Sequence, residues 1–160
     1  MNVEFWNEEE LKILFLGSFL KLIQFQTKET NLFFDRKMVG KVQEIELGGK
    51  VDMLVAKGRQ KPKVPYLILH EYKQERRKEP DPLAQLVSEM LVAQEINGTN
   101  EHYLYGAYIV GRNWFFVIFK EREYAVSDAF SATGEDIFKI ARILKKSKQY
   151  IEQFLAADKG

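Results

Sequence analysis

An uninterrupted apolar run that ends abruptly in charged residues constrains this chain more than any other feature. Residues 64–69 read Val-Pro-Tyr-Leu-Ile-Leu, and the charged side chains of Glu71 and Lys73 follow closely. Such a run predicts a strand over 64–72 that lies deep in a sheet. Burying charge at the end of a core strand costs free energy unless the charge is paired or binds a metal ion. The run therefore predicts a polar site at the end of this strand.

A second acidic side chain, Asp52, lies near the start of the preceding predicted strand at 51–56. Side chains two apart in a strand point to the same face of a sheet, so Glu71 and Lys73 project together. If the two strands are hairpin neighbours joined by the polar loop at 57–63, Asp52 lies beside Glu71. Two carboxylates and a lysine then converge on one patch. This set suits Mg²⁺, which prefers a few carboxylate oxygens together with water and phosphate.

The remaining periodicity predicts an α/β fold in which a central mixed sheet is flanked by helices. The predicted elements, in chain order, are a helix from Asn7 to about Gln26, a modest strand at 40–47 with a hairpin turn at Gly48-Gly49, the strands at 51–56 and 64–72, a helix that begins at Asp81-Pro82 and ends at Asn97-Gly98, strands at 103–110 and 114–120, and a long amphipathic helix at 134–157. No linker or repeat interrupts this order, so we interpret 1–160 as a single domain.

The composition narrows the chemistry further. The chain has no cysteine, which excludes disulfides, thiolate metal sites and cysteine nucleophiles, and its two histidines are too few for a histidine-built zinc site. Twenty-four basic residues face 23 acidic ones, so the net charge of +1 neither requires nor excludes a polyanionic partner. The acidic N-terminus is the reverse of a signal peptide, so we expect a cytoplasmic protein with no membrane partner.

The order of elements and two short motifs resemble a known superfamily. A helix, three strands, a helix and a strand span 8–111, with Gly-Lys-Val-Asp ending at Asp52 and Glu-Tyr-Lys at 71–73. This pattern resembles the PD-(D/E)XK nucleases, which share the restriction-endonuclease-like fold, and it is loosely similar to the nuclease domains of type I restriction subunits. The resemblance implies an αβββαβ core, with the strand and helix within 112–157 as peripheral additions.

The resemblance also implies roles for individual residues. Asp52 and Glu71, together with the backbone carbonyl of Tyr72, would hold Mg²⁺, for which Mn²⁺ would be a substitute. Lys73 would be the catalytic lysine. Gln85, one turn into the following helix, would be a catalytic-site residue that orients groups near the metal.

The chain departs from the family pattern at several positions. Val51 stands where the family name has proline, and Glu89 stands where some relatives carry a tyrosine after the glutamine. Many members supply a further acid from the first helix, and we choose Glu10 as the candidate metal ligand of this kind. Capping of the helix start is the alternative role for the three acids at 8–10.

Basic residues close to the predicted site are candidates for contact with nucleic acid. Lys50 lies within the first motif, and Arg76, Arg77 and Lys78 follow the second; such side chains neutralise phosphates. An ordinary solvated loop is the alternative for these residues. His70 points to the face opposite the carboxylates, which indicates a structural histidine rather than a general base.

These features predict a metal-dependent nuclease that hydrolyses phosphodiester bonds, with DNA as the favoured substrate. The alternative is a catalytically silent module of the same fold that binds nucleic acid or a protein partner. A purely structural α/β domain would instead place Asp52 and Glu71 apart. The sequence leaves open whether the strand cut is DNA or RNA, single or double, and whether a homodimer forms.

Overall fold

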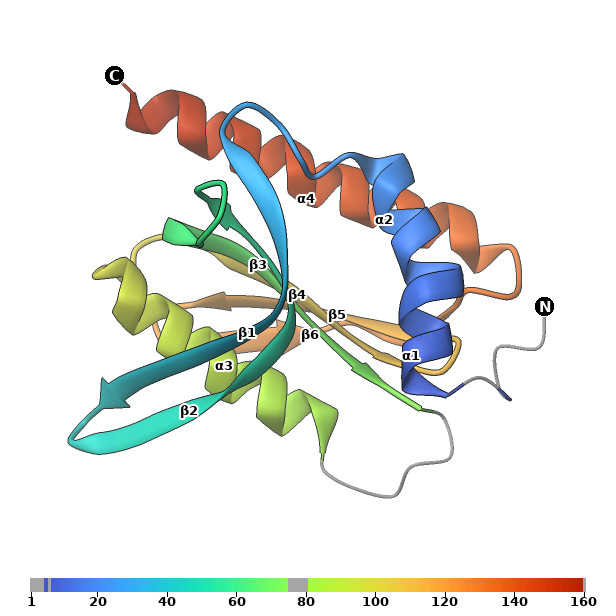
Figure 1. The fold of residues 1–160 in the computed structure, drawn as a ribbon, viewed down its shortest axis with the longest axis horizontal. Helices are drawn as coiled ribbons and strands as arrows, with labels where there is room; N and C mark the ends of the chain where they lie inside the picture. The colour runs from blue at the N-terminus through green and yellow to red at the C-terminus, as the bar shows by residue number, and fades with distance from the viewer. Residues whose placement is uncertain (1–4, 6, 75–80, 160) are drawn as a thin grey trace.

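One mixed sheet with helices on both faces makes up the fold (Figure 1). The computed structural model describes residues 5, 7–74 and 81–159. In this part of the chain the strands are β1 (Thr30–Val42), β2 (Ile45–Lys57), β3 (Lys63–Lys73), β4 (Leu104–Val110), β5 (Asn113–Lys120), β6 (Glu123–Val126) and β7 (Phe130–Ser131). The helices are α1 (Glu8–Glu10), a π-helical segment η2 (Leu11–Leu16), α2 (Gly17–Ile23), α3 (Pro82–Asn97) and α4 (Asp136–Asp158). The expectation of a mixed sheet flanked by helices is confirmed.

The strand order is β1-β2-β3-β4-β5-β6, and β7 pairs with β5 at its other end. Neighbouring strands are antiparallel except β3 and β4, which are parallel. A parallel pair needs a crossover, and α3 supplies it between the end of β3 and the start of β4. The crossover brings α3 back over the sheet, with its side chains facing β1, β2 and β3.

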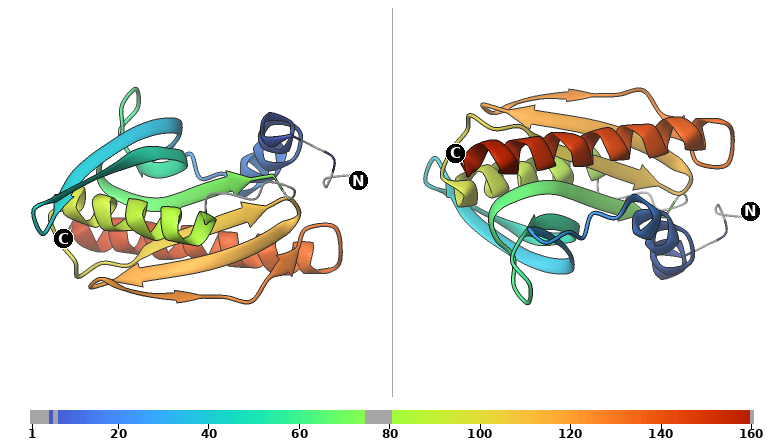
Figure 2. Two further views of the ribbon diagram at one scale, coloured as in Figure 1. Left: turned by 90° about the horizontal axis from the view of Figure 1, so that it is seen from below. Right: turned by 90° about the horizontal axis from the view of Figure 1, so that it is seen from above.

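Each face of the sheet carries its own hydrophobic core. On one face α2 and α4 pack through residues such as Leu20 and Leu144, together with Trp114 of β5. On the other face α3 packs through Leu86 and Met90. Figures 1 and 2 show α4 and α3 on opposite sides of the strands. Since Trp114 is buried and α4 closes one core, the segment 112–157 contributes to the core rather than only adding to its edge.

The first helix begins as predicted. Asn7 Oδ1 accepts a hydrogen bond from the N–H of Glu10 at 2.9 Å, and Glu10 Oε2 accepts one from the N–H of Asn7 at 2.7 Å. This reciprocal capping box satisfies two of the free N–H groups at the helix start. The helical backbone continues to Ile23, where Gln24 adopts a left-handed conformation.

The prediction for the first hairpin was wrong. The segment 40–47 is not one strand, because β1 turns into β2 at Gln43 and Glu44, both with positive φ. Gly48 and Gly49 do not form a turn but lie within β2, where they pair with Val39 and Met38. Strand β1 therefore begins ten residues earlier than the predicted strand at 40–47.

The other predicted elements are confirmed with small shifts at their ends, except that the strand predicted at 51–56 begins six residues earlier, at Ile45 of β2. The strand at 64–72 is β3, and the helix after Asp81-Pro82 is α3, which ends at Gly98 in a left-handed conformation. The short strands β6 and β7 were not predicted. Among the described residues, no helix is long and apolar enough to cross a membrane.

Candidate active site

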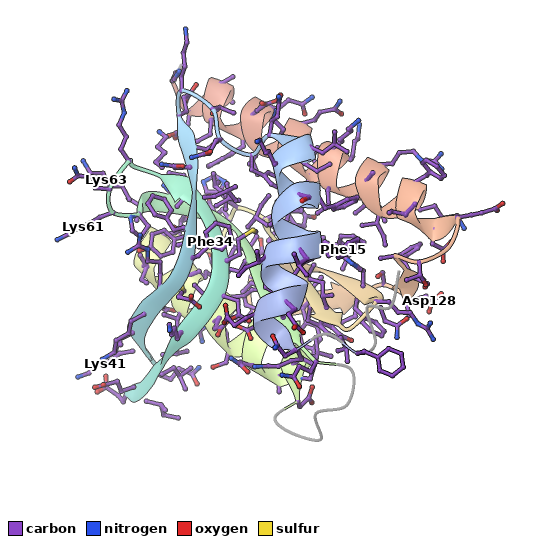
Figure 3. The ribbon with its side chains drawn as sticks, turned by 45° about the vertical axis from the view of Figure 1, so that its right-hand side comes forward. Phe15, Phe34, Lys41, Lys61, Lys63 and Asp128 are labelled. Carbon is purple, nitrogen blue, oxygen red and sulfur yellow. The ribbon has the colours of Figure 1, made fainter. Side chains whose placement is uncertain are left out.

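The pairing of β2 with β3 brings Asp52 and Glu71 together. Met53 lies opposite His70 in the antiparallel register, so Asp52 and Glu71 occupy the next positions along the two strands. The main-chain N–H of Tyr72 donates a hydrogen bond of 2.8 Å to Asp52 Oδ2, which fixes the Asp52 carboxylate against β3. The loop between the strands, including the exposed Lys61, lies at their other end (Figure 3).

Glu71 and Lys73 share one face of β3, as their spacing predicts. Lys73 Nζ lies 3.6 Å from Glu71 Oε2, and the Lys73 side chain is only 14% exposed. The aromatic ring of Tyr72 points to the opposite face, where it is buried in the core beneath α2 and α4. The ammonium and the carboxylate are therefore held side by side at the end of a buried strand.

The Glu71 carboxylate is fully buried, and no described residue donates a hydrogen bond to it. Its side chain is 0% exposed, and within the described residues neither Oε1 nor Oε2 has a hydrogen-bond partner. Burial, as the largest cause, and the carboxylates of Glu89 and Asp52 together raise the pKa of Glu71 to about 10, although the Lys73 ammonium opposes this rise. A carboxylate with free lone pairs in such a place is stabilised by a proton or by a cation.

Glu89 is a functional candidate that the sequence analysis missed. It lies on α3, is 4% exposed, and its Oε2 has no hydrogen-bond partner among the described residues. Burial raises the pKa of Glu89 to about 7. The signal in the sequence was a lone acid inside an apolar helical segment, one turn after Gln85. Within the family pattern, by contrast, Glu89 is only a departure from the tyrosine that some relatives carry.

Gln85 is positioned by the start of α3. Asp81 caps this helix, because its Oδ1 accepts hydrogen bonds from the N–H groups of Leu83 at 3.0 Å and Ala84 at 3.4 Å. One turn later, Gln85 Nε2 donates a 3.4 Å hydrogen bond to Glu89 Oε1. Gln85 therefore lies at the site and orients a carboxylate, although that carboxylate belongs to Glu89.

The other predicted site residues have separate positions. Glu10 is exposed, and its carboxylate serves in the capping box, which was the alternative role for this residue. Lys50 is 66% exposed on β2 and lies 3.9 Å from Asp35 Oδ1. Arg76, Arg77 and Lys78 fall outside the described residues.

His70 is a packed structural residue, as expected. It is 1% exposed, its Nδ1 lies 3.1 Å from the hydroxyl of Tyr72, and its ring meets Trp114 edge to face. Burial lowers the pKa of His70 to about 3, so the ring is neutral at ordinary pH. A neutral ring enclosed on the core side of the sheet does not serve as the general base.

The donor set of the site fits a hard divalent cation. Asp52 and Glu71 supply carboxylate oxygens from adjacent strands, and neither oxygen of Glu71 accepts a hydrogen bond from the described part of the chain. Among the described residues, no three His, Asp or Glu side chains form a group arranged to hold a metal ion. Mg²⁺ is commonly bound by one or two carboxylates, with water and substrate phosphate completing its shell, so two protein carboxylates are sufficient.

No family model, curated protein or solved structure matches the chain. Its function is therefore inferred from its own residues and their geometry.

Proposed function

We propose that this chain is a Mg²⁺-dependent nuclease of the PD-(D/E)XK type, with a restriction-endonuclease-like fold, that hydrolyses phosphodiester bonds in DNA. The observation that carries the proposal is the Glu71 carboxylate. It is fully buried, receives no hydrogen bond from the residues that the structure describes, and lies beside Asp52 on the next strand and 3.6 Å from the Lys73 ammonium. A structural ion pair would need only Glu71 and Lys73, so the additional buried carboxylates favour a cation.

Asp52 and Glu71 would hold Mg²⁺ or Mn²⁺, with the Tyr72 carbonyl as the further ligand that the resemblance implies. The bound metal supplies a water of lowered pKa and stabilises charge on the attacked phosphate. Tyr72 contributes in a second way, because its N–H holds Asp52 Oδ2 at 2.8 Å and so fixes that carboxylate before any ligand arrives. Preorganised ligands avoid a reorganisation cost at the moment of reaction.

Lys73 provides the positive charge of the site. Its ammonium group is largely shielded from solvent, so its attraction for a phosphate oxygen is weakened little by water. A lysine in this position donates hydrogen bonds to the attacking water or to the oxygen that gains charge. Gln85 holds Glu89 at the wall of the site through its 3.4 Å hydrogen bond, and it is a positioning residue.

The β1–β2 hairpin offers basic side chains to a nucleic-acid backbone. Lys50 precedes Asp52 by two residues and is exposed, and Lys41 projects near the tip of the hairpin (Figure 3). Exposed lysines that approach phosphates release counterions and strengthen binding at low salt. The hairpin is therefore the surface on which we place the strand to be cut, with Arg76, Arg77 and Lys78 remaining predicted contacts.

The test is cleavage by the purified protein of circular plasmid, end-labelled single-stranded and double-stranded DNA, and RNA. Each substrate is incubated with Mg²⁺, with Mn²⁺ and with EDTA. We expect metal-dependent cleavage of DNA that Asp52→Asn lowers by roughly two to three orders of magnitude. The asparagine retains an oxygen that accepts the Tyr72 N–H, so the fold is kept while a ligand charge is lost.

Asp128→Asn is the matched control, because it makes the same charge change at an exposed residue on the side of the molecule away from the hairpin (Figure 3). Cleavage that neither variant lowers would point to a contaminating nuclease. If no substrate is cleaved with either metal, the nuclease proposal fails. Retained DNA binding in a gel-shift assay would then favour a catalytically silent binding module.

A further inference from the structure

A cavity of about 460 Å³ lies between the β1–β2 hairpin and α3 and shares a wall with the candidate active site. Met38, Gly48 and Gly49 line it from the hairpin, and Asp81, Ala84, Gln85, Ser88, Glu89 and Val92 line it from α3. Figure 1 shows the hairpin extending past α3 on this side of the sheet. The volume lies within the range of about 300–1,000 Å³ that is usual for small-ligand sites.

Glu89 connects the cavity to the site. Its side chain lines the cavity, while its carboxylate also faces Glu71 and raises the pKa of that residue. A ligand in the cavity therefore lies next to the place where a scissile phosphate would meet Lys73.

Gly49 keeps the cavity open, and neither its backbone nor its packing demands a glycine. Its backbone is not left-handed, and an added Cβ would meet only Glu89 Oε1, at an ordinary contact distance of 3.7 Å. A glycine inside a strand weakens the strand and often marks a close approach by a ligand. The missing side chain leaves room directly beside Glu89.

The chemistry of the lining selects the ligand. The carboxylates of Asp81 and Glu89 repel a phosphate, so the sugar–phosphate backbone does not fit here. The same carboxylates accept hydrogen bonds from amino groups, and Ser88 adds a hydroxyl. Met38 offers a thioether, which makes favourable contact with an aromatic ring. A flat heterocycle with exocyclic amino groups meets all these conditions.

We propose that this cavity, here named the base subsite, binds one unpaired nucleobase next to the phosphate that is cut. The inference rests on the proposed nuclease function and defines its substrate class. A base within a duplex must be unpaired and unstacked before it enters such a cavity, which costs a few kcal/mol, so a single strand or an end that frays is the favoured substrate. Adenine, cytosine and guanine carry the required amino group, whereas thymine and uracil do not.

The test uses single-stranded DNA oligonucleotides in which one abasic nucleotide is moved along the sequence. With the wild-type protein, an abasic nucleotide at one fixed distance from the cut should lower cleavage there roughly tenfold, while other positions have little effect. Gly49→Leu should lower cleavage of the intact strand to the same degree and make the abasic nucleotide at that position harmless. Ser88→Leu, which fills the cavity from α3, should act in the same way.

Val39→Leu is the matched control, since Val39 pairs with Gly48 but is exposed and does not line the cavity. It should cleave like the wild type. Gly49→Ala fits without displacement, so it can replace Gly49→Leu if that variant folds poorly. Its cleavage rate should lie between that of the wild type and that of a variant with a filled cavity. Cleavage with no position-specific abasic effect, or with both leucine variants equal to the wild type, would overturn the base subsite and leave the nuclease proposal intact.

A binding measurement separates the two proposals when nothing is cut. Oligonucleotides carrying 2-aminopurine report on unstacking through their fluorescence, and Asp52→Asn protein can be titrated into them without cleavage. A saturable change in fluorescence would support the subsite even if the wild type cleaves no substrate, provided that adding Gly49→Leu to the Asp52→Asn protein removes it and adding Val39→Leu does not. No such change, together with no cleavage, would overturn both proposals.

Discussion

Glu71 of β3 and Glu89 of α3 face each other as two buried carboxylates, and each has at least one oxygen without a hydrogen bond among the described residues. The sheet supplies one and the crossover helix supplies the other, so their approach depends on the tertiary fold. Both have raised pKa values, about 10 for Glu71 and about 7 for Glu89, chiefly because of burial. This pair makes the stability of the site sensitive to pH.

We expect the metal-free protein to lose stability as pH rises. A carboxyl whose folded-state pKa is raised stabilises the fold fully below its ordinary value of 4.5, and for Glu71 this contribution is lost as pH approaches about 10. Thermal unfolding in EDTA should therefore show a falling melting temperature from about pH 5 to about pH 9. Glu71→Gln should flatten this dependence. A variant that unfolds with the same pH dependence as the wild type would show that Glu71 is not the group responsible.

Metal binding should tighten with pH for the same reason. A cation that binds to Glu71 displaces the proton that the carboxyl pair of Glu71 and Glu89 holds, so binding releases protons. A higher pH favours this release and therefore favours binding. Calorimetric titration with Mn²⁺ in two buffers of different ionisation enthalpy measures both affinity and proton release. Affinity should increase between about pH 6 and about pH 8. Bound Mn²⁺ should raise the melting temperature, and removing it with EDTA should reverse this rise. An affinity that does not change with pH would contradict the proposal that Glu71 binds the metal.

Lys73→Met should separate metal binding from chemistry. The variant keeps both carboxylates, so it should still bind Mn²⁺, but cleavage should fall by roughly two to three orders of magnitude because a charge-stabilising group is lost. Cleavage rate and Mn²⁺ affinity should be measured on the same preparation. Lys57→Met, at the far end of β2, is the control and should cleave normally. If Lys73→Met cleaves as fast as this control, Lys73 has no role in catalysis.

Glu44→Gly should stabilise the first hairpin. Glu44 has a φ of 67°, a left-handed conformation that costs a residue with a side chain about 1 kcal/mol and costs glycine little. Urea unfolding should therefore show a free energy of unfolding higher by about 1 kcal/mol, with an unchanged slope. The same substitution at Glu46, inside β2, should lower it instead.

Leu144→Ala should affect stability without affecting the site. Leu144 is buried in the core beneath α4, on the sheet face opposite Glu71 and Glu89. The substitution should lower the free energy of unfolding by about 2–5 kcal/mol, as large-to-small changes in a core do. Cleavage measured well below the melting temperature should remain near the wild-type rate. Lys145→Ala, the exposed neighbour, should change neither quantity.

The sequence was informative where one local signal decided the structure. The apolar run that forms β3, and the Asp81-Pro82 start of α3, could both be predicted, and so could the shared face of Glu71 and Lys73. The first hairpin could not, because Gln43 and Glu44 are not residues that usually form a tight turn, whereas Gly48-Gly49 resembles one. The charged Asp35 and its neighbours also hid the alternation of β1.

The site was predicted only as far as two strands can specify it. Neighbouring strand ends fixed the approach of Asp52 and Glu71, since the register of one hairpin is a local property. The approach of Glu89 to Glu71 depends instead on how α3 crosses the sheet. The cavity beside them depends on the path of the β1–β2 hairpin. Neither is encoded in a short motif.

The sheet divides the hydrophobic core into two parts, so substitutions on its two faces should have different consequences. The carboxylates, the lysine and most of the cavity wall come from residues 48–89 and lie on the α3 face or at its edge, while α2, α4 and Trp114 close the opposite face. Substitutions on the α4 side can therefore change the size and shape of side chains without altering the candidate active site. In a set of natural variants, we expect drift to concentrate there and the 48–89 stretch to change in concert.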